Sequence, residues 1–415
     1  MGCFNFQGSS LEYIFYLLSL WQAYQAVQLA GLLRREWGSL KQEPLTSRKL
    51  HLAEQAAFYL AVPPAVLVHE ISHAIPIYVW GGRVVNCGYG FYWGYVQPDR
   101  FFPAGQEWFI ALAGTLGSLA VGLLYWLWAM RQQNRTLQFF GLRAFRFQIY
   151  FSLLIYPIFT AVTFIGDWRT IYDFATTPLL SGATAVVHLG LLGWYFWADR
   201  SGRFEMVAHD SVAAQQQFAQ LEAQAQMNPQ DAKIQLQYIE ALRRGRAANR
   251  AKRQLQQFLQ RNTSSGEAYL LQALLALENK RTVTKTAVTH IQRALELGLP
   301  ETQQQTVAHH LLGQYYLERE AYTEAAQAFS QVIALSQPAD NPVRLAEAYR
   351  GRSVAYRRQK QYDLAYQDVQ QAISLAQSRG QEEQVKSLRN ELQIIEQHAG
   401  RPLGTSPSKQ EGGEN

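Results

Sequence analysis

The amino-acid sequence predicts an all-α protein in which a polytopic bundle of about five transmembrane helices is followed by a soluble α-solenoid of repeated helix pairs. Long apolar runs and the tryptophans lie in the first half, whereas the later residues are rich in Gln, Ala, Leu, Glu and Arg. Similar amphipathic segments recur in this later part. We therefore divide the 415-residue chain into a membrane domain (1–203), a repeat domain (204–398) and a disordered tail (399–415).

The apolar runs give about five candidate membrane spans. The first contains Gln22, Gln25 and Gln28 at helical spacing, which places three amides on one stripe that faces the bundle. A helix of this kind also suits the membrane surface, and in that case about four spans remain. The spans run from about residue 11 to 33, 56 to 80, 108 to 130, 149 to 165 and 179 to 197.

The second span carries the motif His69-Glu70-Ile71-Ser72-His73, shortly after a kink expected at Pro63-Pro64. The two histidines lie one helical turn apart on one face, so both imidazoles can reach the same metal ion. Glu70 lies about 100° further round the helix, where its carboxylate can take a proton from a water molecule that the metal activates. Because ionisable groups are costly inside a membrane, these three indicate a functional site. Pairing with each other or with the backbone is the alternative.

A catalytic zinc ion keeps three protein ligands and one water molecule, so the two histidines need a partner from elsewhere in the chain. Asp167 is the best candidate because it follows the fourth span directly after Gly166, where a carboxylate can approach the metal with little steric hindrance. Asp173 is the next candidate. His188, in the fifth span, is expected to face inward and form hydrogen bonds rather than bind the metal.

The segment 81–98 consists of short strand-like runs separated by glycines and is too interrupted to span the membrane. Strand-like backbone at this depth must be covered by protein or line a cavity. It fits a β-hairpin that leans over the motif and offers an edge to an extended peptide, or an aromatic loop that anchors neighbouring helices. In the third span, the small residues from Ala113 to Gly117, and Gly122, allow another helix to approach closely.

The second domain contains helical segments that repeat. The clearest copies are 310–335 and 348–375, and weaker copies are 268–297 and 234–259. Tyr316 and Tyr356 occupy matching positions 40 residues apart, which corresponds to a repeat of about 34 residues with a short insertion near residues 338–342. The alternation of small and aromatic residues resembles the tetratricopeptide repeat. That resemblance implies a superhelix that binds protein partners on its concave face, and a non-binding helical spacer is the alternative.

Four pieces within residues 58–168 resemble the site-2 protease family of intramembrane zinc metalloproteases, and more closely its branch of smaller members. They are His69 to Ala74, the loop residues Gly94-Tyr95-Val96, the small residues Ala113 to Gly117, and Asp167. By that resemblance His69 and His73 would bind Zn²⁺, Glu70 would be the general base and Asp167 the third ligand. The substrates would be membrane-spanning proteins.

The chain departs from that family around the aspartate. In the family the aspartate usually lies in a run that begins with Asn-Pro and ends with Leu-Asp-Gly. This chain has Tyr156-Pro157 and then Gly166-Asp167-Trp168. The proline fits the family pattern, while the residues next to the aspartate differ.

Charge and cysteine usage narrow the possible partners. The net charge is +6, but many basic residues of the first half flank apolar spans. Lipid headgroups and membrane topology explain them better than nucleic acid does, so the expected surroundings are a lipid bilayer. The two cysteines, Cys3 and Cys87, support neither a disulfide framework nor a cysteine-ligated metal cluster.

The positive-inside rule predicts an integral, multi-pass protein whose repeat domain is cytoplasmic. Three basic groups fall on one side when the spans number about five. They are the residues from Arg34 to Lys49, a loop with Arg131, Arg135, Arg143 and Arg146, and the pair Arg200 and Arg203. This orientation makes the motif helix run outward, opposite to the usual arrangement in the resembled family.

Two functions are compatible with these features. The first is an intramembrane zinc metalloprotease whose repeats recruit or regulate proteins. The second is a catalytically inactive, membrane-anchored scaffold that presents the repeats to protein partners. The intact histidines and Glu70 favour the protease.

Overall fold

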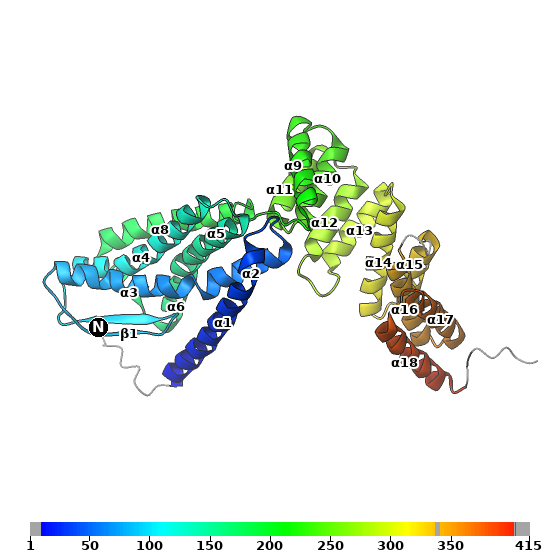
Figure 1. Ribbon diagram of the computed structural model, residues 1–415, viewed down its shortest axis with the longest axis horizontal. Coiled ribbons are helices and arrows are strands. Elements are labelled where there is room, and N and C mark those ends of the chain that lie inside the picture. The colour runs from blue at the N-terminus through cyan, green and yellow to red at the C-terminus, as the bar shows by residue number, and fades with distance from the viewer. Residues whose placement is uncertain (1–9, 337–340, 402, 404–415) are drawn as a thin grey trace, which may run out of the picture. The chain divides into compact units, whose positions relative to one another are not determined.

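The computed structural model describes residues 10–336, 341–401 and 403, and in this part of the chain it consists of helices and one β-hairpin (Figure 1). The chain forms two compact units, Met1–Ala251 and Lys252–Asn415. The division falls after the change in composition near residue 203, because α9 (Val212–Met227) and α10 (Ala232–Arg244) belong to the first unit. Cys3, residues 338–340 of the expected insertion and almost all of the expected tail lie outside the described residues.

The first unit begins with eight α-helices, a short π-helix and a hairpin. The elements are α1 (Ser10–Leu40), α2 (Ser47–Tyr59), α3 (Val62–Val79), β1 (Val84–Tyr89), β2 (Gly94–Pro98), α4 (Ala104–Met130), α5 (Arg135–Tyr150), the π-helix (Phe151–Ile155), α6 (Tyr156–Thr163), α7 (Asp167–Ile171) and α8 (Pro178–Arg200).

Four helical segments of the described chain are long and apolar enough to cross a membrane. They are Ser47–Val79, Ala104–Met130, Arg135–Thr163 and Pro178–Arg200. The first predicted span lies within α1, which is not among these four. The expected loop around Arg135, Arg143 and Arg146 was wrong, because these residues are helical and belong to α5. Asn134 caps that helix by accepting a hydrogen bond from the backbone N–H of Leu137.

The prolines ahead of the motif begin a helix instead of kinking one. α2 ends at Tyr59, and Pro63 and Pro64 lie in the first turn of α3. The backbone nitrogens of a first turn have no partner within the helix, so proline there loses no hydrogen bond and its fixed φ angle suits the helix.

α4 packs closely against α3 and α5 through glycines, as the sequence predicts. A Cβ added at Gly114 would lie 2.6 Å from Nε2 of His69, and one at Gly122 would lie 2.7 Å from Cβ of Gln148. Any larger residue at these two positions would push the helices apart. The glycines therefore determine how near α4 lies to the motif on α3.

His188 compensates for a proline in the third apolar segment. Pro157 has no N–H, so the carbonyl of Leu153, four residues earlier, lacks its helical partner. His188 Nε2 donates to that carbonyl at 2.6 Å, and the Tyr172 hydroxyl donates to Nδ1. The prediction that His188 faces inward and forms hydrogen bonds is confirmed. The first bond holds α8 against the π-helix, and the second holds it against the segment that follows Asp167.

The hairpin predicted in segment 81–98 is present. β1 pairs antiparallel with β2, and Gly88 lies opposite Tyr95. At its tip, Tyr89 donates a hydrogen bond to the carbonyl of Pro63 at 2.8 Å, and Tyr92 donates to the carbonyl of Phe58 at 3.1 Å. The hairpin therefore runs back along α3 toward the start of that helix.

The second unit consists mainly of successive helix pairs, coloured from green to red in Figure 1. Three of the four predicted repeat copies correspond to these pairs, and the copy at 234–259 corresponds to α10 and α11. The elements are α11 (Ala248–Arg261), which crosses the division between the units, α12 (Gly266–Leu277), α13 (Lys285–Leu297), α14 (Thr302–Glu318), α15 (Tyr322–Leu335), α16 (Pro342–Arg358), α17 (Tyr362–Gln377) and α18 (Glu382–Ala399).

Phe329 explains the alternation of small and aromatic residues in these repeats. Its side chain is 1% exposed and lies between α14 and α16. A Cβ added at Gly313 would lie 2.7 Å from the Phe329 ring, and one at Gly351 would lie 2.5 Å from it. Both glycines are needed because the ring fills the space between the helices.

We predict that Phe329→Ala lowers the free energy of unfolding of the repeats by about 3–5 kcal/mol, because it leaves a cavity between helices. Denaturant unfolding of the full chain in detergent, followed by circular dichroism, measures this change. Leu364→Ala on α17 is the matched control. Leu364 is 44% exposed, so its truncation should change the free energy of unfolding little. Equal stability of the two variants would contradict this description of the repeat core.

Candidate metal centre

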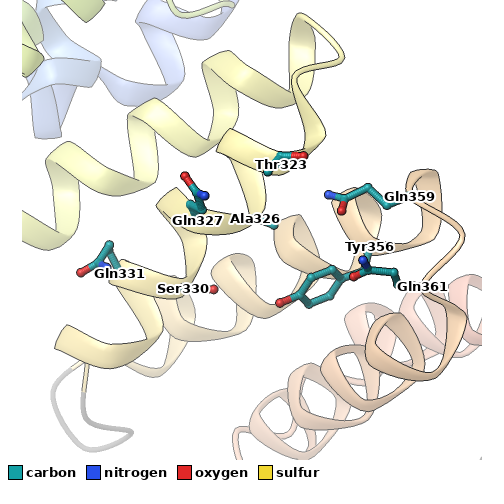
Figure 2. A pocket seen from close by; sticks show the side chains of 8 residues that line it. All are labelled: Thr323, Ala326, Gln327, Ser330, Gln331, Tyr356, Gln359 and Gln361. Carbon is teal, nitrogen blue, oxygen red and sulfur yellow. The ribbon is translucent and has the colours of Figure 1, made fainter.

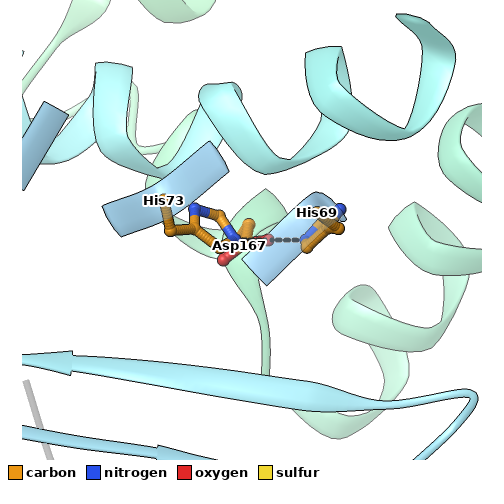
Figure 3. A group of neighbouring side chains, drawn as sticks. All are labelled: His69, His73 and Asp167. Carbon is orange, nitrogen blue, oxygen red and sulfur yellow. Dashed lines mark hydrogen bonds and ion pairs between the residues drawn. The ribbon is translucent and has the colours of Figure 1, made fainter. Parts of the chain in front are cut away.

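Three side chains of metal-ligand type meet where α3, α4 and α7 approach one another (Figure 3). Oδ2 of Asp167 lies 2.9 Å from Nε2 of His69 and 3.2 Å from Nε2 of His73. All three ligand atoms lie within 4.8 Å of one another. Among the described residues this is the one group of three or more His, Cys, Asp or Glu side chains arranged in this way.

The distances suit a single bound metal ion. Ligand bonds to zinc are about 2.0–2.2 Å long, so ligand atoms at tetrahedral angles lie about 3.3–3.6 Å apart. The two Asp167 distances, 2.9 and 3.2 Å, are a few tenths of an ångström shorter than this. Two histidines and one carboxylate, with a fourth position for water, form a set that catalytic zinc sites use. The residues present therefore fit a zinc ion.

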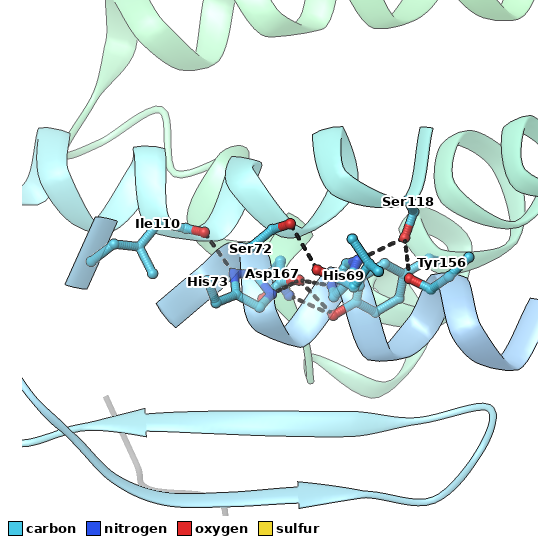
Figure 4. A network of polar contacts seen from close by, with 9 residues as sticks. His69, Ser72, His73, Ile110, Ser118, Tyr156 and Asp167 are labelled. Atoms are coloured by element: carbon cyan, nitrogen blue, oxygen red, sulfur yellow. Dashed lines mark hydrogen bonds and ion pairs between the residues drawn. The ribbon is translucent and has the colours of Figure 1, made fainter. Parts of the chain in front are cut away.

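Hydrogen bonds turn both imidazoles toward the centre (Figure 4). Nδ1 of His73 lies 2.6 Å from the carbonyl oxygen of Ile110. A carbonyl only accepts, so Nδ1 carries the proton and Nε2 presents a lone pair. Nδ1 of His69 lies 3.2 Å from Oγ of Ser118, which itself donates toward the carbonyl of Ala65 at 3.5 Å. Ser118 can therefore accept from Nδ1–H of His69, and in that tautomer Nε2 of His69 presents a lone pair as in His73.

With these tautomers, three acceptor atoms face one another. The Nε2 lone pairs of His69 and His73 and the carboxylate oxygen of Asp167 converge at the distances given above. Acceptors at this separation repel each other unless a cation, either a proton or a metal ion, lies between them. The electrostatics of the cluster therefore favour a bound cation.

Gly114 leaves the space that this cation needs. A Cβ at position 114 would overlap with Nε2 of His73 and would lie 2.6 Å from Nε2 of His69. A side chain there would occupy the position where the two imidazoles converge. The small residues of α4 thus do more than allow close helix packing.

Glu70 lies beside the three ligand-type residues and against the hairpin. A Cβ added at Gly94, the first residue of β2, would lie 2.5 Å from Cγ and 2.8 Å from Oε1 of Glu70. The carboxylate is half-buried between α3 and β2. The strand backbone and the Glu70 side chain are therefore neighbours.

The two aspartates considered as third ligand occupy different environments. Asp167 begins α7 and faces both histidines. Asp173 accepts hydrogen bonds from the backbone N–H groups of Ala175 and Thr176 at 3.1 and 3.2 Å. It stabilises its own turn and is not part of the group around His69. The side chains of His69, His73 and Asp167 are 12%, 8% and 21% exposed, so the cluster is largely buried with a partial opening.

Sequence reasoning missed Tyr156. Its hydroxyl donates to Oδ2 of Asp167 at 3.0 Å and accepts from the backbone N–H of Asp167 at 3.1 Å. The ring also lies edge-on to His69, with 5.8 Å between centroids. The Tyr156-Pro157 pair was the one signal in the sequence that pointed to this residue. In the sequence analysis it served only to show how the chain departs from the resembled family.

Comparisons with known proteins leave the chain without a family. No protein-family model matches it, and no curated protein does. One similar solved structure is titled "Crystal structure of MamA". Its TM-score is 0.31 at 18% identity, and the match covers 40% of this chain and 89% of that one. Another, "Crystal structure of MamA protein", has a TM-score of 0.30 at 18% identity, and the match covers 40% of this chain and 83% of that one. A third, "MamA RS-1 ArsTM double mutant", has a TM-score of 0.29 at 17% identity, and the match covers 41% of this chain and 94% of that one.

We predict that Gly114→Ala weakens zinc binding on the order of tenfold or more while leaving every ligand in place, because the added methyl group displaces the imidazoles. Zinc bound to the purified chain, measured by mass spectrometry after dialysis against a chelator series, tests this. Gly182→Ala in α8 is the control, because nothing lies within 4 Å of a Cβ there. If Gly114→Ala bound zinc as tightly as the wild type, the metal would have to bind at another place in the chain.

Proposed function

We propose that the first unit is an intramembrane zinc metalloprotease that hydrolyses peptide bonds of membrane-spanning proteins. The observation that carries this proposal is the convergence of two imidazole nitrogens and one carboxylate oxygen, from His69, His73 and Asp167. α3 and α4 belong to the segments that are apolar enough for a membrane, and α7, with Asp167, lies between the third and the fourth of them. An ionisable cluster in such surroundings indicates function because burying it is costly.

In this proposal His69, His73 and Asp167 hold the zinc ion. When bound, zinc supplies a Lewis acid that lowers the pKa of a coordinated water molecule toward about 7 and polarises the scissile carbonyl. Glu70 accepts the proton of the attacking water, whose oxygen forms the new bond to the carbonyl carbon. As the C–N bond breaks, Glu70 passes this proton to the leaving amine. The place of Glu70 next to the ligands suits a base that does not itself bind the metal.

The hairpin suits the presentation of an extended substrate. A helical substrate has its carbonyls hydrogen-bonded within the helix, so the scissile segment must be unwound before attack. An extended peptide can pair with backbone groups along the edge of a two-stranded hairpin. Because β2 begins at Gly94 against Glu70, a peptide beside this strand passes close to the proposed base. The bonds from Tyr89 and Tyr92 to the helices hold the hairpin in that place.

For the second unit we propose recruitment of proteins. One pocket of about 340 Å³ lies against α15 and the end of α16 (Figure 2). Its lining carries hydroxyl and amide groups and no charged side chain, which suits the main-chain groups of a peptide. The lining residues are Thr323, Ala326, Gln327, Ser330, Gln331, Tyr356, Gln359 and Gln361.

Membrane insertion with a cytoplasmic repeat domain is part of the proposal. The segments after α1, α4 and α8 contact one another in the first unit. Asn134 donates to the carbonyl of Leu40 at 3.1 Å, and the N–H of His209 donates to the carbonyl of Leu45 at 2.8 Å. Counted with the adjoining helix ends, these connections carry Arg48, Lys49, Arg135 and Arg200, which supply the charge asymmetry that the positive-inside rule uses.

We predict that Glu70→Gln retains zinc but abolishes cleavage, because the amide cannot accept the proton while the ligands are unchanged. Membrane-protein fragments in cells with the wild-type chain or the variant, compared by mass spectrometry, measure cleavage, and elemental analysis measures zinc. Glu107→Gln, on the first turn of α4 and outside the cluster, is the control. If the wild-type chain contained no zinc, and if cells with the wild-type chain and cells with the variant produced identical fragments, the inactive scaffold would be supported instead.

A further inference from the structure

We propose that Tyr156 is a positioning residue of the metal centre, whose hydroxyl holds the Asp167 carboxylate in the orientation that binds the ion and so sets metal affinity and coordination geometry. The inference rests on the proposed function in that it takes the cluster to be a metal site. It adds a fourth residue to the centre and assigns it a role separate from ligand binding and from proton transfer.

The hydroxyl of Tyr156 makes two hydrogen bonds to the same residue (Figure 4). It donates to Oδ2 of Asp167 at 3.0 Å, and it accepts from the backbone N–H of Asp167 at 3.1 Å. Oδ2 is also the atom that faces Nε2 of His69 and of His73. One hydroxyl therefore fixes both the backbone of Asp167 and the oxygen that points at the imidazoles.

This arrangement removes a freedom that a carboxylate ordinarily has. The terminal torsion of an aspartate is broad and roughly two-fold, so an unrestrained group samples many orientations of its two oxygens. A carboxylate oxygen has two acceptor positions, so Oδ2 can bind an ion while it accepts the Tyr156 O–H. Removing a hydrogen-bond partner of this kind from a metal ligand typically lowers metal affinity about 10–100-fold.

The fold around Tyr156 brings its hydroxyl to this place. Gly166 has φ of +121°, which side chains other than glycine rarely adopt, and a Cβ there would lie 2.9 Å from the Tyr156 hydroxyl. Tyr156 itself follows the π-helix, and its N–H bonds to the carbonyl of Phe151 five residues earlier. A π-turn adds a residue to the helix and so changes which side chains face inward, and such turns are frequent at functional sites.

The test is Tyr156→Phe in the full chain, which keeps the ring and removes only the hydroxyl. Zinc affinity is measured by competition with a chelator, and the cobalt-loaded protein is measured by its visible absorption spectrum, which reports coordination geometry. We expect zinc affinity to fall about 10–100-fold and the cobalt spectrum to change. Tyr195→Phe, which removes a hydroxyl from another buried tyrosine of the same unit, should leave both unchanged.

Two further variants separate positioning from packing. Thr160→Val changes the other buried side chain that faces Gly166, one helical turn after Tyr156, and it should bind both ions like the wild type. Gly166→Ala displaces the Tyr156 hydroxyl and, at a φ of +121°, also strains the backbone next to Asp167, so it should lose affinity as Tyr156→Phe does. If Tyr156→Phe fails to fold, wild-type affinity in Gly166→Ala still contradicts the inference.

Wild-type zinc affinity and an unchanged cobalt spectrum in Tyr156→Phe, or in Gly166→Ala where only that variant folds, would overturn the inference. That result leaves the proposed function standing, since the wild-type chain would still bind both ions. A wild-type chain that binds neither zinc nor cobalt would overturn the proposed function itself. The two failures are thus distinguished by the wild-type measurement.

Discussion

The structure of the first unit depends on one electrostatic constraint, the approach of three acceptor atoms inside an apolar helix bundle. Nε2 of His69, Nε2 of His73 and Oδ2 of Asp167 lie too close together to be stable without a cation between them. Burial strengthens the repulsion that an empty cluster would suffer, and equally the attraction for an ion. Because the cluster is largely buried, the surrounding helices rather than water must hold these groups.

Features that look unrelated along the chain serve this cluster. Gly114 leaves room between α4 and the imidazoles, and the carbonyl of Ile110 sets the tautomer of His73. Pro157 interrupts the helix that ends before Asp167, and His188 satisfies the carbonyl that the proline leaves without a partner. The hairpin brings Gly94 against Glu70. At Pro157 the backbone departs from a regular helix, and the His188 side chain compensates for the departure.

The sequence was informative where the chemistry is local. The spacing of His69 and His73, the strands on either side of residues 90–93, the inward-facing His188 and the repeated helix pairs all follow from periodicity or from single residue types. Long-range features were not accessible in this way. Asp167 lies 98 residues from His69, so its selection over Asp173 needed a guess about which turn faces the motif. Tyr156 had no local pattern, and α5 was mistaken for a loop because its arginines are paired with carboxylates of α2 and α8.

X-ray absorption of zinc in the purified full chain tests the central claim most directly, because it reports the atoms bound to the ion. The account predicts one zinc site with nitrogen and oxygen neighbours at about 2.0–2.2 Å and the outer scattering of two imidazole rings. Asp167→Ala should remove one oxygen neighbour or lose the zinc. A sulfur neighbour at about 2.3 Å, or a site that lacks two imidazoles, would contradict the assignment of His69, His73 and Asp167.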